Sequence, residues 1–544
     1  MTRQFSTGPS ITRRKLMSTT AAAAASISAM KLVDSLAAPN PGATIAFSRW
    51  QTGTNTFVLP VNGDPYRWPF APAIPNILFN KTVYSGLIKY DLDGVTPIPD
   101  LATEWSTEDA ITWTFNLRDD VTWHDGTPFT AEDVKFTFDA MLDPENTVTN
   151  RGVLVTLTST EVVDPHTVTL TFSEPVASLP VGLGYLIFIL PKHLLDGTDL
   201  NNPVDFVANP VGTGPFMFKE FVSGDHTTVI PNPDYFGQVA QVEAVVFKQV
   251  PDLNTQMLQI RTGELDVAFP EVQQLDAIEG LDTVTVTTST PIQYFFIGFN
   301  NRRPIFQDKL VRQALAHAVD REAIVEAVIQ GNATLATGPI NPAIEWAYNP
   351  NVTTYDYDED RARDLLAEAG WTEGSGGILE KDGEQLSFTI YSTAGNSTRE
   401  QINTALQQYF AAVGADAKLE FLEPNVFDQN MFSFEFDALM HFSQLQPDPD
   451  LINYYGTDRG NNYFGYSNPE VDELLAQGRA TVDQAERAEI YGRFQEILAD
   501  DLPVIFFYYP HEIDVINNRV ENYPPLDFRN ATLYLNQITL SDAS

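Results

Sequence analysis

The chain has 544 residues, of which 43% are hydrophobic, so it is long enough to bury two or three hydrophobic cores. It carries 72 acidic and 32 basic residues, a formal net charge of -40, and its field repels nucleic acid and anionic membrane surfaces. Such an excess of acid suits a salt-rich medium that screens self-repulsion, so we expect a halophilic source. Without cysteine, these residues form no disulfide, no thiolate metal site and no lipid-modified N-terminal cysteine.

The first 38 residues resemble an export signal of the twin-arginine type. Arg13 and Arg14 precede a weakly apolar stretch, residues 16–30, and small residues up to Ala38 form a signal-peptidase site. We therefore expect export to the periplasm or to the extracellular face of the cytoplasmic membrane. A basic tail with an alanine-rich helix is the alternative. A second apolar run, which starts at Val181, is too short to span a bilayer and indicates buried core.

The first half of the chain is predicted to be rich in strands. Residues 43–50, "ATIAFSRW", predict a first strand, followed by a polar, proline-rich run up to Pro75. Residues 113–117 alternate as in a half-buried strand, and Asp125-Gly126 predicts a turn. Thr130 and Asp133 then form a capping box at the start of a helix.

The pattern continues with a strand-rich block over residues 166–195 and a strand pair with glycine turns over residues 211–236. Residues 242–250 predict another strand, ahead of a helix that ends at Gly263.

From about Asn300 the pattern changes from strand-rich to helix-rich. Five polar residues precede helical periodicity and predict helix starts: Asp308, Asp320, Asp358, Asn468 and Asp483. A final strand follows Pro503, and a polar tail runs to Ser544. The sequence therefore predicts two mixed α/β lobes that meet near Asn300, with the chain returning near Tyr509.

Several motifs in this order resemble a known family. They include "PDLATEW" (99–105), "TFNLRDDVTWHDGTPFTAEDV" (114–134), "NPVGTGPF" (209–216) and "GYSNPEVDELL" (465–475). The chain is similar to the extracytoplasmic solute-binding proteins of family 5, the oligopeptide, dipeptide and nickel type of ABC importers. The resemblance implies an α/β, two-lobed fold of the periplasmic-binding-protein kind (class II, large cluster with an inserted subdomain) and a cleft that closes by a hinge.

The resemblance also implies a division of the chain. Lobe I would comprise residues 39–85, 205–298 and 512–544, with residues 86–204 as its inserted subdomain, and lobe II residues 299–511. A monomer would enclose a small organic solute, an oligopeptide or oligosaccharide, and deliver it unchanged to ABC transporter permease subunits. No catalysis, cofactor or metal is expected.

Catalytic and metal-binding motifs give little support to an enzyme. The seven histidines form no closely spaced pair, and we interpret His124 as structural because it lies beside the Asp125-Gly126 turn. The acidic run from Tyr355 imitates an EF-hand, but Arg361 and Ala367 stand where glycine and glutamate are required. No nucleophile elbow is present. Because paired carboxylates cannot be judged by counting, a secreted glycoside hydrolase stays a weak alternative.

The segment "SQLQPDPDLINYYG" (443–456) bears on the ligand. In peptide-binding relatives an aspartate before Pro-Asp-Pro holds the ligand's α-ammonium, and alignment on Pro447–Pro449 puts Leu445 at that position, with Gln446 at a tyrosine. Leucine cannot neutralise a buried cation, so a free peptide amine is disfavoured unless Asp450 compensates from a shifted register. A neutral oligosaccharide is the alternative, because Gln444 and Gln446 both donate and accept hydrogen bonds.

Other candidates come from aromatic side chains and from two loops that the resemblance places near the cleft. Aromatic rings, including Tyr463, could stack on a ligand, and Arg399 could meet a ligand carboxylate. The expected ligand-binding residues are Arg49, Trp50, Gln51, Trp346, Asn396, Arg399, Phe442, Gln444, Leu445, Gln446 and Tyr454.

Overall fold

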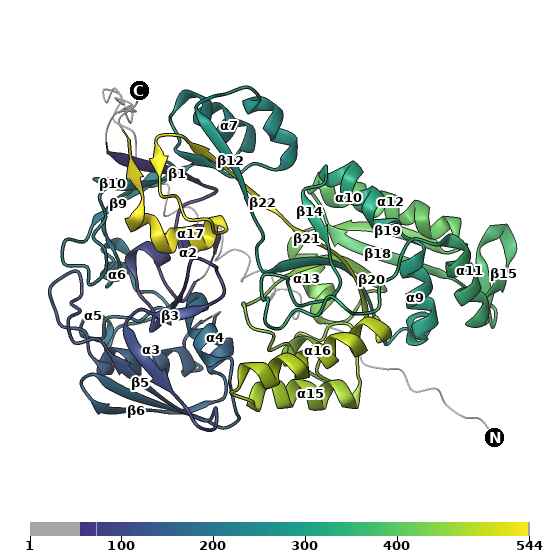
Figure 1. Ribbon diagram of the computed structural model, residues 1–544, viewed down its shortest axis with the longest axis horizontal. Helices are drawn as coiled ribbons and strands as arrows, with labels where there is room; N and C mark the ends of the chain where they lie inside the picture. Colours follow the sequence, from purple (N-terminus) through teal and green to yellow (C-terminus); the bar gives the residue numbers. More distant parts are fainter. Residues whose placement is uncertain (1–54, 72, 149, 542–544) are drawn as a thin grey trace, which may run out of the picture. The chain divides into compact units, whose positions relative to one another are not determined.

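The computed structural model describes residues 55–71, 73–148 and 150–541, and its secondary structure is mixed α/β (Figure 1). The expected signal, residues 1–38, and the expected strand at 43–50 lie outside the described residues. The same holds for Arg49, Trp50 and Gln51.

Two four-stranded sheets form in the first part of the described chain. One has the order β1-β10-β9-β8, with β1 parallel to β10, and the other is antiparallel in the order β4-β5-β7-β6. The strands are β1 (Thr56–Val61), β4 (Ala102–Ser106), β5 (Thr112–Leu117), β6 (Leu157–Asp164), β7 (Thr167–Phe172), β8 (Phe216–Val222), β9 (His226–Pro231) and β10 (Ala244–Gln249). A short pair, β2 (Ile88–Tyr90) and β3 (Pro97–Pro99), lies between β1 and β4 in the sequence.

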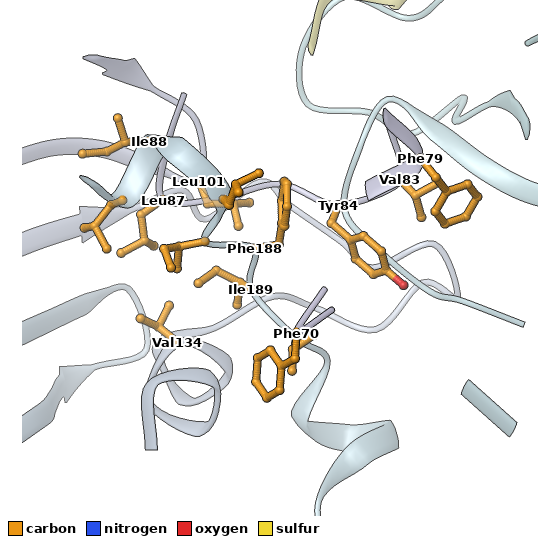
Figure 2. Close-up of a cluster of buried hydrophobic side chains, with 14 of the residues drawn as sticks. Phe70, Phe79, Val83, Tyr84, Leu87, Ile88, Leu101, Val134, Phe188 and Ile189 are labelled. Atoms are coloured by element: carbon orange, nitrogen blue, oxygen red, sulfur yellow. The ribbon is translucent and has the colours of Figure 1, made fainter. Parts of the chain in front are cut away.

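Helices cover these sheets and enclose one large core. They are α2 (Ile74–Val83), α3 (Ala131–Leu142), η1 (Arg151–Leu154), α4 (Leu179–Leu186), α5 (Lys192–Leu195) and α6 (Val204–Ala208). Figure 2 shows part of the core, where the rings of Tyr84 and Phe188 lie 6.3 Å apart between centroids. A Cβ on Gly212 would collide with the Val83 carbonyl oxygen, so glycine at this position allows the segment to pack closely against the end of α2.

A six-stranded sheet organises residues 293–510. Its order is β14-β21-β13-β20-β18-β19, with β18 parallel to both β19 and β20 and the remaining pairs antiparallel. The strands are β13 (Gln293–Phe299), β14 (Ala333–Leu335), β18 (Ser387–Thr393), β19 (Asp416–Leu422), β20 (Ala438–Gln444) and β21 (Val504–Pro510). A small sheet of β15 (Thr372–Glu373), β16 (Leu379–Lys381) and β17 (Glu384–Gln385) lies beyond α11 in the sequence, with η3 (Ser375–Gly377).

Five helices of this second region begin where the sequence predicts. Asp308, Asp320, Asp358, Asn468 and Asp483 each accept a hydrogen bond from a backbone amide at a helix start. The helices are α8 (Pro304–Gln307), α9 (Lys309–His317), α10 (Arg321–Ile329), α11 (Glu359–Glu368), α12 (Ser397–Ala412), α13 (Pro424–Phe432), α14 (Ile452–Tyr455), α15 (Pro469–Ala480) and α16 (Gln484–Asp501). Their apolar faces and the sheet form hydrophobic clusters separate from the core of the first region.

A three-stranded sheet joins distant parts of the sequence. Strand β22 (Glu512–Asn517), directly after β21, lies between β11 (Val267–Ala268) and β12 (Val284–Ser289) and is antiparallel to both. The neighbouring elements are α7 (Leu253–Thr262), η2 (Val272–Ile278), β23 (Val520–Glu521), α17 (Phe528–Ala531), η4 (Thr532–Gln537) and β24 (Thr539–Leu540). As predicted, α7 ends at Gly263, which adopts a left-handed conformation.

Three sequence predictions need correction. The run up to Pro75 contains strand β1 and the start of helix α2, because its apolar residues 57–61 pair in register with the distant β10. The block 166–195 contains one strand, β7, followed by helices α4 and α5. The polar tail contains strand β22 and helix α17. In the described ranges, no helix has the length and hydrophobicity that a membrane span requires.

Candidate functional site

Three cavities border strands β13, β20 and β21 of the six-stranded sheet. The first cavity, of about 310 Å³, is lined by side chains that include Glu271, Phe295, Asn396, Arg399, Glu512 and Asp514. The second, of about 30 Å³, includes Lys81, Tyr90, Tyr185, Gln444, Leu445 and Arg529. The third, of about 160 Å³, includes Tyr294, His441, Phe442, Gln444, Tyr454 and Tyr463.

Arg399 carries a positive charge on the wall of the first cavity. It lies in the first turn of α12, where the Asn396 side chain accepts a hydrogen bond from the Arg399 backbone N–H at 2.8 Å. Its guanidinium donates to Thr393 Oγ1 at 2.5 Å and lies 5.2 Å from the ring centroid of Phe442 and 5.9 Å from that of Phe295. Burial lowers the pKa of Arg399, and no described carboxylate forms an ion pair with it.

Acidic side chains lie on another wall of the same cavity. Glu512 and Asp514 are two residues apart on β22, so their side chains share one face of the strand. Burial, together with the charge of Glu512, raises the pKa of Asp514 to about 8. Burial raises the pKa of Glu512 to about 7, although Arg529 Nη2 donates to Glu512 Oε1 at 2.5 Å. Glu271 is exposed at the cavity.

The second cavity places a cation beside Leu445. Lys81 is 4% exposed, and its Nζ donates to Asn530 Oδ1 at 2.6 Å. Burial lowers the pKa of Lys81 to about 8, so it is mostly protonated at pH 7. Leu445 is 8% exposed and supplies only apolar surface to this cavity. A ligand ammonium in this cavity would meet the like charges of Lys81 and Arg529, with Asp527 as a carboxylate on the lining and no counter-charge from Leu445.

The structure brings together some of the predicted residues and separates others. Asn396 and Arg399 line the first cavity, Gln444 and Leu445 the second, and Phe442, Gln444 and Tyr454 the third. Trp346 lies outside all three, because its ring packs under the Arg487 guanidinium at 5.2 Å. Gln446 is half-buried and also lies outside them.

The acids of the Pro-Asp-Pro segment are engaged within the protein. Arg487 Nη2 and Nη1 donate to the two carboxylate oxygens of Asp448 at 2.7 and 3.0 Å. Ser178 Oγ donates to Asp450 Oδ2 at 3.0 Å, and Arg479 Nε lies 3.3 Å from the same oxygen. Asp450 lines none of the three cavities, so it does not replace the missing ammonium anchor there.

Sequence reasoning missed most of the first cavity. It did not select Glu271, Phe295, Tyr508, Glu512 or Asp514. The sequence feature that could identify two of them is the two-residue spacing of Glu512 and Asp514, because side chains two residues apart lie on the same face of a strand. This spacing is not informative if residues 512–514 are interpreted as part of a polar tail, as the sequence pattern predicts.

The histidine and calcium-loop interpretations agree with the local geometry. The Gly212 N–H donates to His124 Nδ1 at 3.1 Å, which leaves Nε2 to donate to the Gly214 carbonyl at 3.0 Å. Burial lowers the pKa of His124 to about 4, as expected for a neutral structural imidazole. Asp358 caps helix α11. Over the described ranges, no three His, Asp or Glu side chains cluster in a way that could hold a metal ion.

Comparison of the sequence with known proteins identifies a family and similar proteins. The family description "bacterial extracellular solute-binding proteins, family 5 Middle" matches residues 96–464. Oligopeptide-binding protein AppA of Bacillus subtilis (strain 168) is 30% identical over 418 residues, which cover 75% of this chain and 77% of that protein. The dipeptide-binding protein of Escherichia coli (strain K12) is 26% identical over 468 residues, 81% of this chain and 86% of that protein.

Solved structures give a similar result. Bacillus subtilis AppA in complex with a nonapeptide matches with a TM-score of 0.75 and 27% identity, covering 90% of this chain and 99% of that chain. NikZ from Campylobacter jejuni, in complex with Ni(L-His), matches with a TM-score of 0.76 and 27% identity, covering 89% and 99%.

Proposed function

Because this chain belongs to the bacterial extracellular solute-binding proteins of family 5, we propose that it captures a short oligopeptide and delivers it to an ABC importer. Proteins of this fold have two lobes, and closure around the solute removes water from the contacts that recognise it. The solute is released to the permease subunits unchanged. The protein therefore acts as a carrier and not as an enzyme.

The observation that carries the proposal is the state of Arg399. Its guanidinium is partly buried at the largest of the three cavities, and in the described part of the chain its contacts are with a threonine hydroxyl and aromatic faces and with no carboxylate. A buried charge without a counter-charge is unfavourable, and a ligand carboxylate would supply two hydrogen-bond acceptors in the geometry that arginine matches. The solute should therefore carry a carboxylate.

The position of the peptide amine follows from the remaining charges. Two basic side chains, Lys81 and Arg529, and one carboxylate, Asp527, line the second cavity, and this excess of positive charge disfavours an ammonium there. Glu271 lines the first cavity and would attract one, and an ammonium bound there would favour the ionised forms of Glu512 and Asp514, whose pKa values burial raises to about 7 and about 8. A short peptide would thus place both of its termini at the first cavity. Its amine would then lie away from the segment 443–456, whose counterpart anchors the amine in peptide-binding relatives.

A neutral oligosaccharide is the second candidate. Gln444 lines both smaller cavities, and the aromatic rings of the third cavity could stack on a sugar face. Such a ligand would leave the Arg399 charge without a partner on closure, so the peptide is favoured.

Isothermal titration calorimetry distinguishes the two candidates. We expect the purified protein to bind tripeptides with free carboxylates, and to bind their C-terminal amides about 10- to 100-fold more weakly, as for a charge-assisted hydrogen bond. Arg399→Met should remove this difference, whereas Arg118→Gln, a change at a half-buried arginine that is paired with Asp120 and lines none of the three cavities, should keep it. Binding of oligosaccharides without any binding of tripeptides would contradict the proposal.

We also propose how the protein reaches its site of action. Export by the twin-arginine route rests on Arg13, Arg14 and the apolar stretch after them, and a salt-rich habitat rests on the net charge of -40. A change of both arginines to lysine should retain the precursor in the cytoplasm, as measured by cell fractionation. Export of the variant at the normal rate would contradict this route. We further propose that the carrier works as a monomer.

A further inference from the structure

The third cavity differs from the other two because no formally charged side chain lines it. It lies within the second region of the fold, between β13, β20 and the segment that follows α14. Seven of its twelve lining residues are phenylalanine or tyrosine, and none is Asp, Glu, Lys or Arg. Its volume of about 160 Å³ resembles that of cavities of about 150 Å³ that hold one benzene ring. The space therefore suits a single uncharged ring.

The tyrosine hydroxyls of the cavity largely have partners inside the protein. The hydroxyls of Tyr294 and Tyr455 lie 3.0 Å apart and share a hydrogen bond. The Tyr463 hydroxyl donates to Asn461 Oδ1 at 3.1 Å. These groups hold the rings in place and leave little hydrogen-bonding capacity for a ligand.

His441 is a second kind of polar group in this cavity. Its imidazole packs at 5.1 Å from the ring centroids of both Phe427 and Phe442, and its Nδ1 is buried without a hydrogen-bond partner in the described part of the chain. Burial, and then the charge of Arg399, lowers the pKa of His441 to about 4. At pH 7 the ring is neutral and offers one donor and one acceptor. A buried polar atom without a partner is rare and calls for an explanation, and at a cavity wall a ligand is one source of the missing partner.

From this arrangement we propose that the third cavity receives the side chain of a tyrosine residue of the bound peptide, whose hydroxyl hydrogen-bonds to Nδ1 of His441. The phenol ring packs against the aromatic wall, which stabilises it beyond the burial of its area. A charged side chain is excluded because nothing in the cavity neutralises it. This inference rests on the proposed peptide function and assigns its side-chain preference.

A peptide series on the unaltered protein tests the preference. Trialanine and its three single-tyrosine derivatives are titrated by calorimetry, together with the matching phenylalanine and glutamate peptides. At one position, tyrosine should bind about 10- to 100-fold more tightly than alanine, from burial of one ring, and glutamate should bind no better than alanine. Equal binding of all peptides would overturn this inference while leaving the proposed function intact. Failure of every peptide to bind would overturn both.

A variant separates the hydrogen bond from packing. His441→Phe keeps an aromatic ring and removes both nitrogens, so the tyrosine peptide should lose about 3- to 10-fold in affinity and the phenylalanine peptide should change little. His317→Phe, at a histidine outside the three cavities, is the matched control and should change neither. Equal losses for both peptides in His441→Phe would contradict the hydrogen bond to Nδ1.

Discussion

The segment around Asp448 contains a buried arginine that lies over an aromatic ring, and the wall of the first cavity contains a partly buried arginine in a similar position. Arg487 lies 5.2 Å from the Trp346 ring centroid, and Arg399 lies 5.2 Å from that of Phe442. Arg487 forms two hydrogen bonds to Asp448, whereas the guanidinium of Arg399 donates, within the described residues, to one threonine hydroxyl. Burial tends to lower both pKa values, but the charge of Asp448 reverses the effect at Arg487 and raises its pKa.

This difference separates a structural charge from a functional one. In a buried ion pair with two hydrogen bonds, each charge is neutralised by a partner within the folded chain. Loss of such a pair should therefore lower the stability of the fold. A buried charge without a counter-ion gains a partner of opposite charge when a ligand binds. Loss of such a charge should therefore weaken ligand binding. Aromatic stacking is common to both arginines and does not distinguish them.

The largest effect is expected from breaking the complete pair. Asp448→Asn leaves the Arg487 charge buried, and the free energy of unfolding should fall by about 3–5 kcal/mol. Urea unfolding followed by circular dichroism measures this change. Asp139→Asn, at an exposed pair with Lys135, is the control and should change stability by less than about 0.5 kcal/mol. Similar losses in the two variants would remove the distinction between the arginines.

The acids of the first cavity predict an effect of pH. Their folded-state pKa values, about 8 for Asp514 and about 7 for Glu512, lie above ordinary values, so the folded state binds more protons at intermediate pH. The resulting stability is fully present below about pH 4 and is lost as the pH rises through about 7 to 8.

Asp514→Asn should remove its part of this dependence. Between pH 5.5 and pH 8.5 the free energy of unfolding of the unaltered protein should fall. In the variant this fall should be smaller, by on the order of 2 kcal/mol, because each pKa unit corresponds to about 1.4 kcal/mol. Urea unfolding at both pH values measures the difference. Asp360→Asn, at a side chain that is 97% exposed, should follow the unaltered protein. Parallel behaviour of Asp514→Asn and the unaltered protein would refute this interpretation.

The sequence predicted the parts of the structure that depend on neighbouring residues. Asp358 and Asp483 could be identified as helix caps because a cap acts on amides within three residues. Arg399 could be selected only through the family resemblance, and its lack of a counter-ion is a property of the folded chain. Glu512 reaches the cavity because β22 pairs with strands more than 200 residues away, which no local pattern records.

A third arginine provides an intermediate case. Arg479 Nε lies 3.3 Å from Asp450 Oδ2 and its Nη1 lies 3.7 Å from Glu174 Oε2, while Ser178 donates to Asp450. These contacts connect residues 174–178 with the second region of the fold. If they stabilise the closed form, Arg479→Gln should weaken ligand binding about 3- to 10-fold without a comparable loss of stability. Calorimetry and urea unfolding on the same variant measure both quantities. If the variant instead lost stability while its affinity for the ligand stayed unchanged, Arg479 would support the fold, as Arg487 does.

The smallest change in stability is expected at Arg399 itself. Arg399→Met removes a buried charge that has no carboxylate partner and replaces it with an apolar side chain that can lie against Phe295 and Phe442. The free energy of unfolding without ligand should therefore stay within about 0.5 kcal/mol of the original value or rise by up to about 1 kcal/mol. Urea unfolding with and without a tripeptide measures this, and the stabilisation by ligand should be smaller in the variant, in line with its weaker binding. A loss of several kcal/mol without ligand would show that Arg399 supports the fold as Arg487 does, and the argument for a carboxylate-bearing solute would fail.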